Sequence, residues 1–285
     1  MGLEADSTRV VADRPLLTFL SDYGLEDEFV GVCHGVIVRR CPAARVIDIT
    51  HAIPRHDIRA GALTLAGALP YMPAGVHLAV VDPEVGAAGV HARRAVAVRP
   101  ATAEHLLVGP DNGLLALALE RLGGALEAVE IGHSAERLEP VSATFHGRDI
   151  FAPVAAALAA GEPLAGLGEP LAVESLQVLE LPVAVVGERE LRAHALHFDH
   201  FGNVTLDADH GQLRQAGLRL GAELVLERAG RYHRGRYATT FADVAAGELL
   251  LYEDARGMAA LAINRGSARD ALAIARDDEL LVRPA

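Results

Sequence analysis

The chain has 285 residues, which suffices for one large domain or two smaller ones with a sizeable core. A formal net charge of −12 argues against a nucleic-acid surface, and 51% hydrophobic residues without any Trp predict an aliphatic core. No uncharged apolar run reaches the ~18–20 residues of a membrane span, and residues 1–14 do not have the pattern of a signal peptide. The cysteines, Cys33 and Cys41, form no CxxC motif, which favours a reducing, cytoplasmic compartment.

The first half of the chain predicts strands that alternate with helices. Buried strands are expected at residues 16–20, 45–49, 76–81, 95–98 and 106–108. Helical spacing of apolar residues predicts helices at residues 27–40, 58–69, 114–122 and 150–160. This alternation is typical of a doubly wound α/β fold with a parallel sheet.

The second half has a different pattern. A Gly- and Pro-rich block at residues 161–170 indicates the start of a connection between domains. Beyond about Leu181 the chain predicts short strands, at residues 192–198, 223–226, 249–252, 258–263 and 279–282. We therefore expect an N-terminal α/β domain at residues 14–175 and a smaller C-terminal β-domain, a barrel or a sandwich, at residues 185–285.

Asp82 is the first candidate for chemistry. It follows the apolar strand at residues 76–81 and precedes Pro83, Glu84, Val85 and Gly86. Ligands of open α/β sheets bind beyond the carboxyl ends of the strands, where this carboxylate is expected. Taken alone, an Asp before Pro is equally typical of a simple turn.

Polar residues follow other predicted strands of the first half as well, and each has a structural alternative. Asp22 and Asp111 could form turns, His51 and Asp57 could belong to a loop, and Arg148 with Asp149 could cap a helix. In the second half, Asp199 and Asn203 flank a Gly-containing turn. They could either shape that turn or bind the ammonium and carboxylate of an amino acid.

Several well-known site patterns are absent from the sequence. It has no HExxH motif and no close His pair on a helical face with a third ligand, so no metal site is predicted. It also has no GxGxxG after the first strand, no P-loop and no GxSxG elbow. A Rossmann-like sheet without a phosphate loop favours a nucleoside-type ligand that lacks a pyrophosphate.

Six motifs, in this order, resemble those of one family. They are Ser21-Asp22-Tyr23-Gly24, His51-Ala52-Ile53-Pro54, Val81-Asp82-Pro83-Glu84-Val85-Gly86 with Arg93-Arg94, Gly109-Pro110-Asp111-Asn112-Gly113, Phe145-His146-Gly147-Arg148-Asp149 and Asp199-His200-Phe201-Gly202-Asn203. The chain is similar to the S-adenosyl-L-methionine (SAM) hydrolases, or SAM hydroxide adenosyltransferases, which are relatives of the bacterial fluorinase and chlorinase. The likeness extends from Leu16 to about Ile274.

The resemblance implies a Rossmann-like N-terminal domain with a mostly parallel sheet, a C-terminal β-barrel, and a homotrimer with active sites between subunits. It implies hydrolysis of SAM to adenosine and L-methionine by water activated for attack at C5′, without a cofactor. The family's catalytic Asp, Arg and His match Asp82, Arg93 and His146, with Arg94 as the alternative arginine. Its residues for ribose and methionine match three positions, Asp22, Asp199 and Asn203.

The chain departs from the family pattern at three places. Glu84 stands where relatives have Gly, the loop before Arg93 is several residues longer, and Ala255 replaces a Ser that helps to hold methionine. Two other functions compete with hydrolysis. A SAM sensor or sink would bind without turnover and would not need the catalytic trio. A halogenase has a Ser at the position of Gly147 and a Tyr at the position of Asp82, so the resemblance favours hydrolysis.

Overall fold

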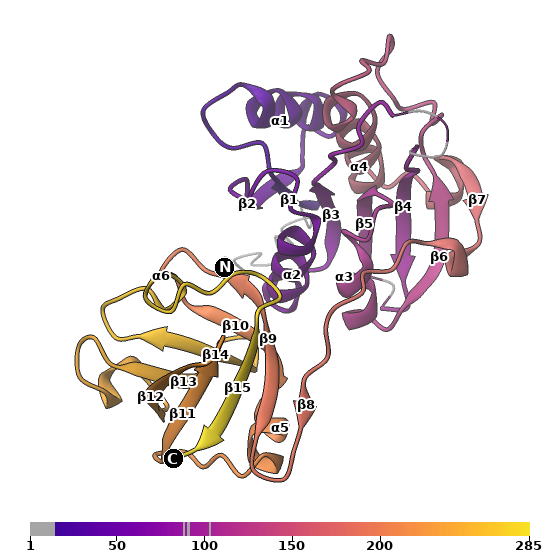
Figure 1. Ribbon diagram of the computed structural model, residues 1–285. Helices are drawn as coiled ribbons and strands as arrows, with labels where there is room; N and C mark the ends of the chain where they lie inside the picture. Colours follow the sequence, from indigo (N-terminus) through magenta and orange to yellow (C-terminus); the bar gives the residue numbers. More distant parts are fainter. Residues whose placement is uncertain (1–14, 88, 90–91, 103) are drawn as a thin grey trace, which may run out of the picture. The chain divides into compact units, whose positions relative to one another are not determined.

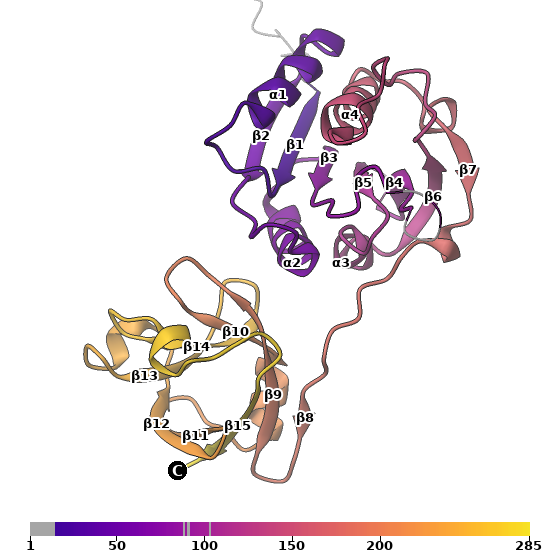
Figure 2. The same ribbon diagram turned by 45° about the horizontal axis from the view of Figure 1, so that its top comes forward.

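The computed structural model describes residues 15–285 except residues 88, 90, 91 and 103. The chain forms two compact units, the first ending at Leu179 and the second running from Glu180 to Ala285 (Figures 1 and 2). This division lies between the predicted domain boundaries at residues 175 and 185. Within the described residues, no helix is both long and apolar enough to cross a membrane.

The first unit is built on one sheet with the strand order β2-β1-β3-β5-β4-β6-β7. Its strands are β1 (Leu16–Ser21), β2 (Arg45–Thr50), β3 (Gly75–Val80), β4 (Ala95–Pro100), β5 (His105–Pro110), β6 (Ala125–Glu130) and β7 (Glu169–Leu171). Strands β2, β1, β3 and β5 are mutually parallel, which confirms the predicted parallel-rich sheet. Strand β4 is antiparallel to both β5 and β6, which the sequence did not predict.

The reversal of β4 has a simple local cause. Only residues 101–104 separate β4 from β5, and parallel neighbours need a crossover of a dozen or more residues. A short connection therefore forces an antiparallel hairpin. The sequence analysis also missed β6 and β7, since residues 125–130 alternate too weakly to stand out and β7 has only three residues.

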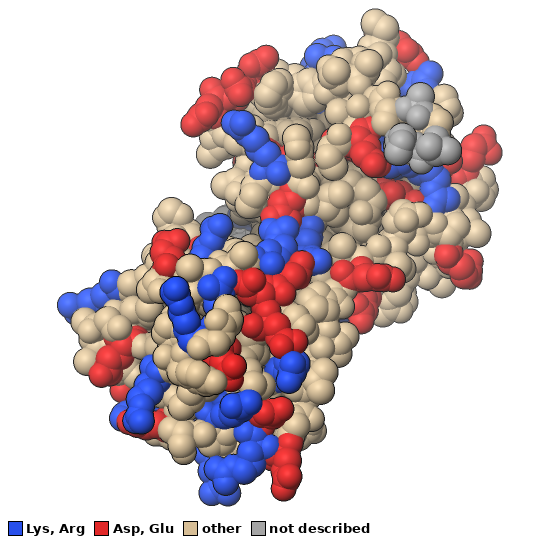
Figure 3. All heavy atoms as spheres, viewed as in Figure 1, with Lys and Arg blue, Asp and Glu red and all other residues tan. Residues whose placement is uncertain are grey.

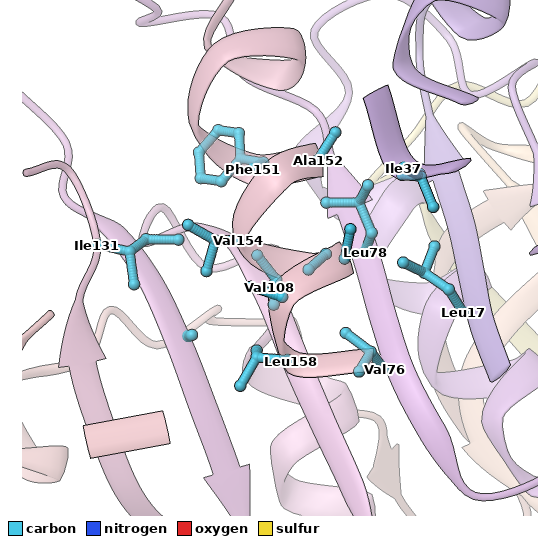
Figure 4. Close-up of a cluster of buried hydrophobic side chains, with 14 of the residues drawn as sticks. Leu17, Ile37, Val76, Leu78, Val108, Ile131, Phe151, Ala152, Val154 and Leu158 are labelled. Carbon is cyan, nitrogen blue, oxygen red and sulfur yellow. The ribbon is translucent and has the colours of Figure 1, made fainter. Parts of the chain in front are cut away.

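Helices cover both faces of this sheet. They are α1 (Phe29–Arg40), α2 (Ile58–Ala68), α3 (Ala116–Arg121) and α4 (Ala152–Ala159). Helices α1 and α4 pack together on one face, and α2 and α3 cover the other (Figure 2). Buried side chains of α4, such as Val154 and Leu158, contact strand residues such as Val76 and Val108 (Figure 4). The core is mainly aliphatic, as the composition predicts, and it includes the buried rings of Phe19 and Phe151.

The second unit is a closed barrel. Its strands are β8 (Val185–Val186), β9 (Leu191–Phe198), β10 (Val204–Asp209), β11 (Glu223–Arg228), β12 (Arg231–Tyr237), β13 (Leu249–Glu253), β14 (Met258–Ile263) and β15 (Glu279–Pro284), with short helices α5 (His210–Gln215) and α6 (Ala268–Ala271). The sheet runs from β10 through β14, β13, β12, β11 and β15 to β9, and β9 pairs with β10 to close it. The predicted β-barrel is confirmed, and the sandwich alternative is wrong.

Three strands of this unit, β8, β10 and β12, were not predicted. Strand β12 has the sequence Arg-Tyr-His-Arg-Gly-Arg-Tyr, in which no apolar alternation marks a buried face. Strand β10 begins at Val204, directly after the turn that Asp199 and Asn203 flank, where no strand was predicted. Basic and acidic side chains are interspersed over the visible surface of the barrel, with no broad region of one sign (Figure 3).

Candidate active site

The first candidate residues meet because their strands are neighbours. Strands β1 and β3 are parallel, and Ser21 is in register with Val80. Asp22 follows Ser21 directly, and Asp82 follows Val80 by two residues. Parallel neighbours end at the same edge of a sheet, so both carboxylates reach the carboxyl edge of the first unit. Both line one cavity of about 630 Å³.

Arg93 reaches this edge because β4 runs against its neighbours. Ala95 at the start of β4 is paired with Pro110 at the end of β5, which brings the preceding residues to the carboxyl edge. Arg93 donates from Nε to Asp82 Oδ1 at 2.9 Å and from Nη2 to Asp82 Oδ2. Such a bidentate arginine–carboxylate pair has a defined geometry. Both side chains are only 6% exposed, so the pair is buried.

The structure separates the two candidate arginines. Arg94 donates from Nε to Asp111 Oδ2 at 2.9 Å and from Nη1 to Ser175 Oγ at 2.9 Å. Arg93 instead contacts His146 as well as Asp82. Consecutive residues of an extended segment point in opposite directions, which accounts for the two different partners. The geometry therefore selects Arg93 as the partner of Asp82.

His146 comes from a distant part of the sequence. It directly precedes the π-helical turn Gly147–Phe151, which continues into α4. Gly86, in the segment after Asp82, has φ +73°, and a Cβ there would lie 2.0 Å from Ala143 O. The backbone after Asp82 thus packs directly against the backbone before His146. Only glycine allows this approach, which brings the two segments together.

The contact with Arg93 fixes the tautomer of His146. Arg93 Nη2 lies 2.8 Å from His146 Nδ1. Arginine offers only N–H donors, so Nδ1 must be the acceptor and a neutral ring carries its proton on Nε2. Burial lowers the pKa of His146 and the charge of Arg93 lowers it further, whereas Asp82 acts in the opposite direction. The imidazole is accordingly neutral near neutral pH.

The cavity combines acidic and aromatic side chains. Its described lining is Asp22, Tyr23, Asp27, Glu28, Phe29, Arg55, His56, Asp82, Val85, Ser142, Thr144, Phe145, His146, Gly147 and Arg148. The rings of Tyr23, Phe29 and Phe145 meet edge to face, with centroids 5.2–6.1 Å apart. Asp22 Oδ2 accepts a hydrogen bond from the backbone N–H of His56 at 2.9 Å. Carboxylates outnumber arginines along this lining, which suits a cationic ligand.

Tyr23 is a lining residue that the sequence analysis did not single out. Burial raises its pKa well above the usual value, so its hydroxyl stays protonated. A Cβ on Gly147 would lie 2.0 Å from Tyr23 Oη. The tyrosine hydroxyl therefore occupies the space that any side chain at position 147 would need. Its place in the Ser21–Gly24 motif was the only sequence signal for this role.

The other polar residues of the first unit have supporting roles. Asn112 donates from Nδ2 to Val81 O at 2.9 Å, which anchors the end of the segment that carries Asp82. Asp57 accepts from the N–H of Ala60 and caps α2. Asp149 is buried and accepts from the N–H of Ser142 at 2.8 Å rather than capping the helix that follows. Residues 88, 90 and 91 of the longer loop before Arg93 lie outside the described residues.

In the second unit, the side chains of Asp199 and Asn203 are hydrogen-bonded to each other across a turn. Asn203 Nδ2 donates to Asp199 Oδ2 at 2.7 Å, and Asp199 Oδ1 accepts from the backbone N–H groups of Phe201 and Asn203. Asn203 also lines a cavity of about 440 Å³ together with Phe201, Phe241, Ile263, Arg265 and Gly266. The pair therefore shapes the turn, and its amide lies at the wall of a cavity.

Comparisons with known proteins agree with this architecture. Residues 17–168 match the SAM hydroxide adenosyltransferase N-terminal domain, and residues 193–281 match the C-terminal domain. A crystal structure of an uncharacterized conserved protein from Thermotoga maritima has a TM-score of 0.85 at 33% sequence identity. That match covers 93% of this chain and 99% of the other.

Named relatives match nearly end to end. A protein named (R)-S-adenosyl-L-methionine hydrolase from Salinispora tropica is 49% identical over 274 residues, covering 95% of this chain and 99% of the relative. One of the same name from Thermus thermophilus is 42% identical over 263 residues, covering 90% and 94%. A fluorinase from Nocardia brasiliensis is 29% identical over 282 residues, covering 89% and 92%. The chain belongs to the SAM hydroxide adenosyltransferase family.

Proposed function

We propose that this protein hydrolyses SAM to adenosine and L-methionine by attack of water at C5′. The observation that carries the proposal is the chain of contacts from Asp82 through Arg93 to His146 beside a cavity that Asp22 also lines. The named hydrolases from Salinispora tropica and Thermus thermophilus support the same reaction. Water supplies the oxygen of the new C5′–O bond, and the electrons of the broken C5′–S bond stay with the methionine sulfur.

Asp82 and His146 bind the attacking water through different groups. Asp82 accepts its proton, through lone pairs that the contacts with Arg93 leave available. His146 offers the Nε2–H group to orient the water oxygen. Placement of the water within reach of C5′ supplies much of the rate gain. Arg93 holds both partners and stabilises the hydroxide-like charge that develops during attack.

The cavity suits the cationic substrate. A sulfonium is attracted by the carboxylates of the lining and by the faces of aromatic rings. Asp22 Oδ2 accepts one backbone hydrogen bond, which leaves lone pairs on its carboxylate for the ribose hydroxyls. We therefore assign Asp22 to ribose binding. As hydroxide-like oxygen meets the sulfonium, charge is dispersed, and a partly water-excluding cavity favours that change.

The methionine part of SAM is assigned to Asp199 and Asn203 of the barrel, as the family resemblance implies. We further propose a homotrimer in which these residues of one chain complete the cavity of another. The residues that line the cavity of the first unit support this, since all described ones lie between Asp22 and Arg148. Mixing inactive Asp22→Ala and Asn203→Ala chains under subunit exchange should restore activity if sites are shared. No rescue despite demonstrated exchange would mean that each site is built within one chain.

Halogenation fits this cavity less well than hydrolysis. The resemblance places the halide-binding Ser of a halogenase at Gly147. The 2.0 Å separation between a Cβ there and Tyr23 Oη leaves no room for that side chain. A SAM sensor without turnover would not require a buried Asp82–Arg93 pair in contact with His146. Hydrolysis is the function that uses all three residues.

The scheme needs no metal at the reacting carbon, and we propose that turnover survives exhaustive EDTA treatment. We also propose a cytoplasmic location, which the free, buried thiols of Cys33 and Cys41 support.

The direct test is to incubate purified protein with SAM and to quantify adenosine and methionine by chromatography. Equal amounts of the two products are expected. SAM binding without product, or formation of a 5′-halogenated adenosine when halide is present, would overturn the proposal. Gly147→Ser serves as a second test, since it should impair turnover without creating halogenation.

A further inference from the structure

Three side chains that are far apart in the sequence gather beside the turn that carries Asp22. His34 lies on α1, Asp48 on β2, and His51 directly after β2. His34 Nε2 lies 2.9 Å from Asp48 Oδ1, and His51 Nε2 lies 3.1 Å from the same oxygen. The three ligand atoms lie within 4.8 Å of one another. None of the three residues is part of the described cavity lining.

These separations match those of atoms that share a small metal ion. Zinc binds imidazole nitrogen and carboxylate oxygen at ~2.0–2.2 Å. Two ligand atoms bound to one ion at tetrahedral or octahedral angles therefore lie roughly 3 Å apart. The Nε2 atoms of His34 and His51 each lie at about this distance from Asp48 Oδ1. The side chain of His34 is 34% exposed and that of Asp48 is 39% exposed, so an ion can enter from solvent.

His51 provides an independent observation. Its side chain is 2% exposed, and Nε2 is buried without a hydrogen-bond partner, because its approach to Asp48 is close but misaligned. The other ring nitrogen, Nδ1, lies 2.7 Å from Ser21 Oγ. If Nδ1–H donates to that hydroxyl, Nε2 presents its lone pair to the carboxylate. A cation bound between Nε2 and the carboxylate of Asp48 removes the repulsion between their lone pairs. Ser21 then orients the imidazole ring, as the outer hydrogen-bond partners of metal-bound histidines do.

We propose that His34, Asp48 and His51 bind a divalent first-row transition-metal ion, with Zn²⁺ the best match to two imidazoles and one carboxylate. The ion joins α1 to the end of β2. His51 O accepts from the N–H of Gly24 at 2.8 Å, and Ser21 precedes Asp22, so the ion also braces the turn that carries Asp22. The role is structural, because the cluster lies outside the described lining of the cavity, so removal of the ion should lower thermal stability while turnover survives.

Spectroscopic titration tests the site. The full-length protein is stripped with EDTA, and Co²⁺ is added while the visible d–d bands are followed, with Zn²⁺ then added as competitor. We expect one Co²⁺ per chain, displaced by one Zn²⁺. His34→Ala and Asp48→Asn should each weaken binding by at least the ~10–100-fold that loss of an outer partner costs. His233→Ala, in the barrel, is the matched control and should bind as the wild type does.

Thermal unfolding gives a second readout, since a ligand that binds the folded state raises its stability. Zn²⁺ should raise the unfolding midpoint of the wild type and of His233→Ala, but not that of His34→Ala. Absence of Co²⁺ binding, or equal binding by His34→Ala and Asp48→Asn, would overturn the proposal. In that case Nε2–H of His51 simply faces the carboxylate of Asp48. Neither readout uses SAM, so failure of this site leaves the proposed hydrolysis untouched.

Discussion

Replacing Asp82 with Asn should slow turnover and should also destabilise the protein, because Arg93 would keep its charge in a buried position. Both side chains are only 6% exposed and are joined by two hydrogen bonds. Removal of one partner from a buried ion pair typically costs ~3–5 kcal/mol of unfolding free energy. Arg93→Gln should cost a similar amount, since it leaves the carboxylate of Asp82 without a counter-charge.

The double variant Asp82→Asn/Arg93→Gln separates the contribution of the ion pair to the unfolding free energy from that of side-chain packing. Neither charge remains, so its loss of stability should be smaller than the sum of the single losses. The interaction energy should lie near the upper end of the ~0.5–3 kcal/mol found for contacting residues. Urea unfolding followed by circular dichroism measures the stabilities, and single-turnover release of adenosine measures the chemistry. All three variants should lose turnover by ~10²–10⁴, the range for a positioned acid–base group.

Arg94→Gln is the matched control for activity. Arg94 is bound to Asp111 and Ser175 rather than to Asp82. It should therefore lose stability while keeping most of its turnover. Additive losses in the double variant, or near wild-type turnover by Arg93→Gln, would refute the reasoning.

Other predictions test the remaining residues. Because burial and Arg93 lower the pKa of His146, the acid limb of the kcat–pH profile should lie below the usual ~6.5 of histidine and vanish in His146→Gln; an unchanged limb would contradict this role. Asp22→Ala should weaken binding of both adenosine and SAM in calorimetric titrations, whereas Asn203→Ala should weaken SAM alone; equal effects on both ligands would reject the division of the substrate. Burial, assisted by His105, lowers the pKa of His77 to about 3. Below pH ~6.5 the imidazole of His77 is therefore protonated in the unfolded chain but not in the folded chain. The contribution of His77 to stability is complete above that pH and should fall by ~1.4 kcal/mol per pH unit on acidification. In urea unfolding, the free energy of unfolding of His77→Gln should depend less steeply on pH than that of the wild type. An equal slope would contradict this contribution of His77.

The sequence was most informative where a strand ends. Asp22 and Asp82 could be predicted to share one edge because parallel strands place their carboxyl ends together. The choice between Arg93 and Arg94 could not be made in this way. It depends on the register and direction of β4, and a shift of one residue exchanges the two side chains. That direction follows from the short connection between β4 and β5, residues 101–104, which a pattern of alternating strands and helices does not reveal.

Without the resemblance, contacts between distant segments could not have been predicted, for a related reason. The approach of Gly86 to Ala143, which brings Asp82 and His146 together, involves backbone atoms that leave no apolar pattern. The cluster that includes His34 and Asp48 requires α1 to pack against β2 at one particular rotation. Strand β12 was missed because its sequence has no apolar alternation, and its place in the barrel comes from pairing with both β11 and β13.

The most direct measurement is turnover of SAM in water enriched in ¹⁸O, with mass spectrometry of both products. Attack of water at C5′ predicts one ¹⁸O atom in adenosine, at the 5′-hydroxyl, and none in methionine. Asp82→Asn should form both products ~10²–10⁴ times more slowly than the wild type does. Adenosine without label, or label in methionine, would contradict hydrolysis at C5′.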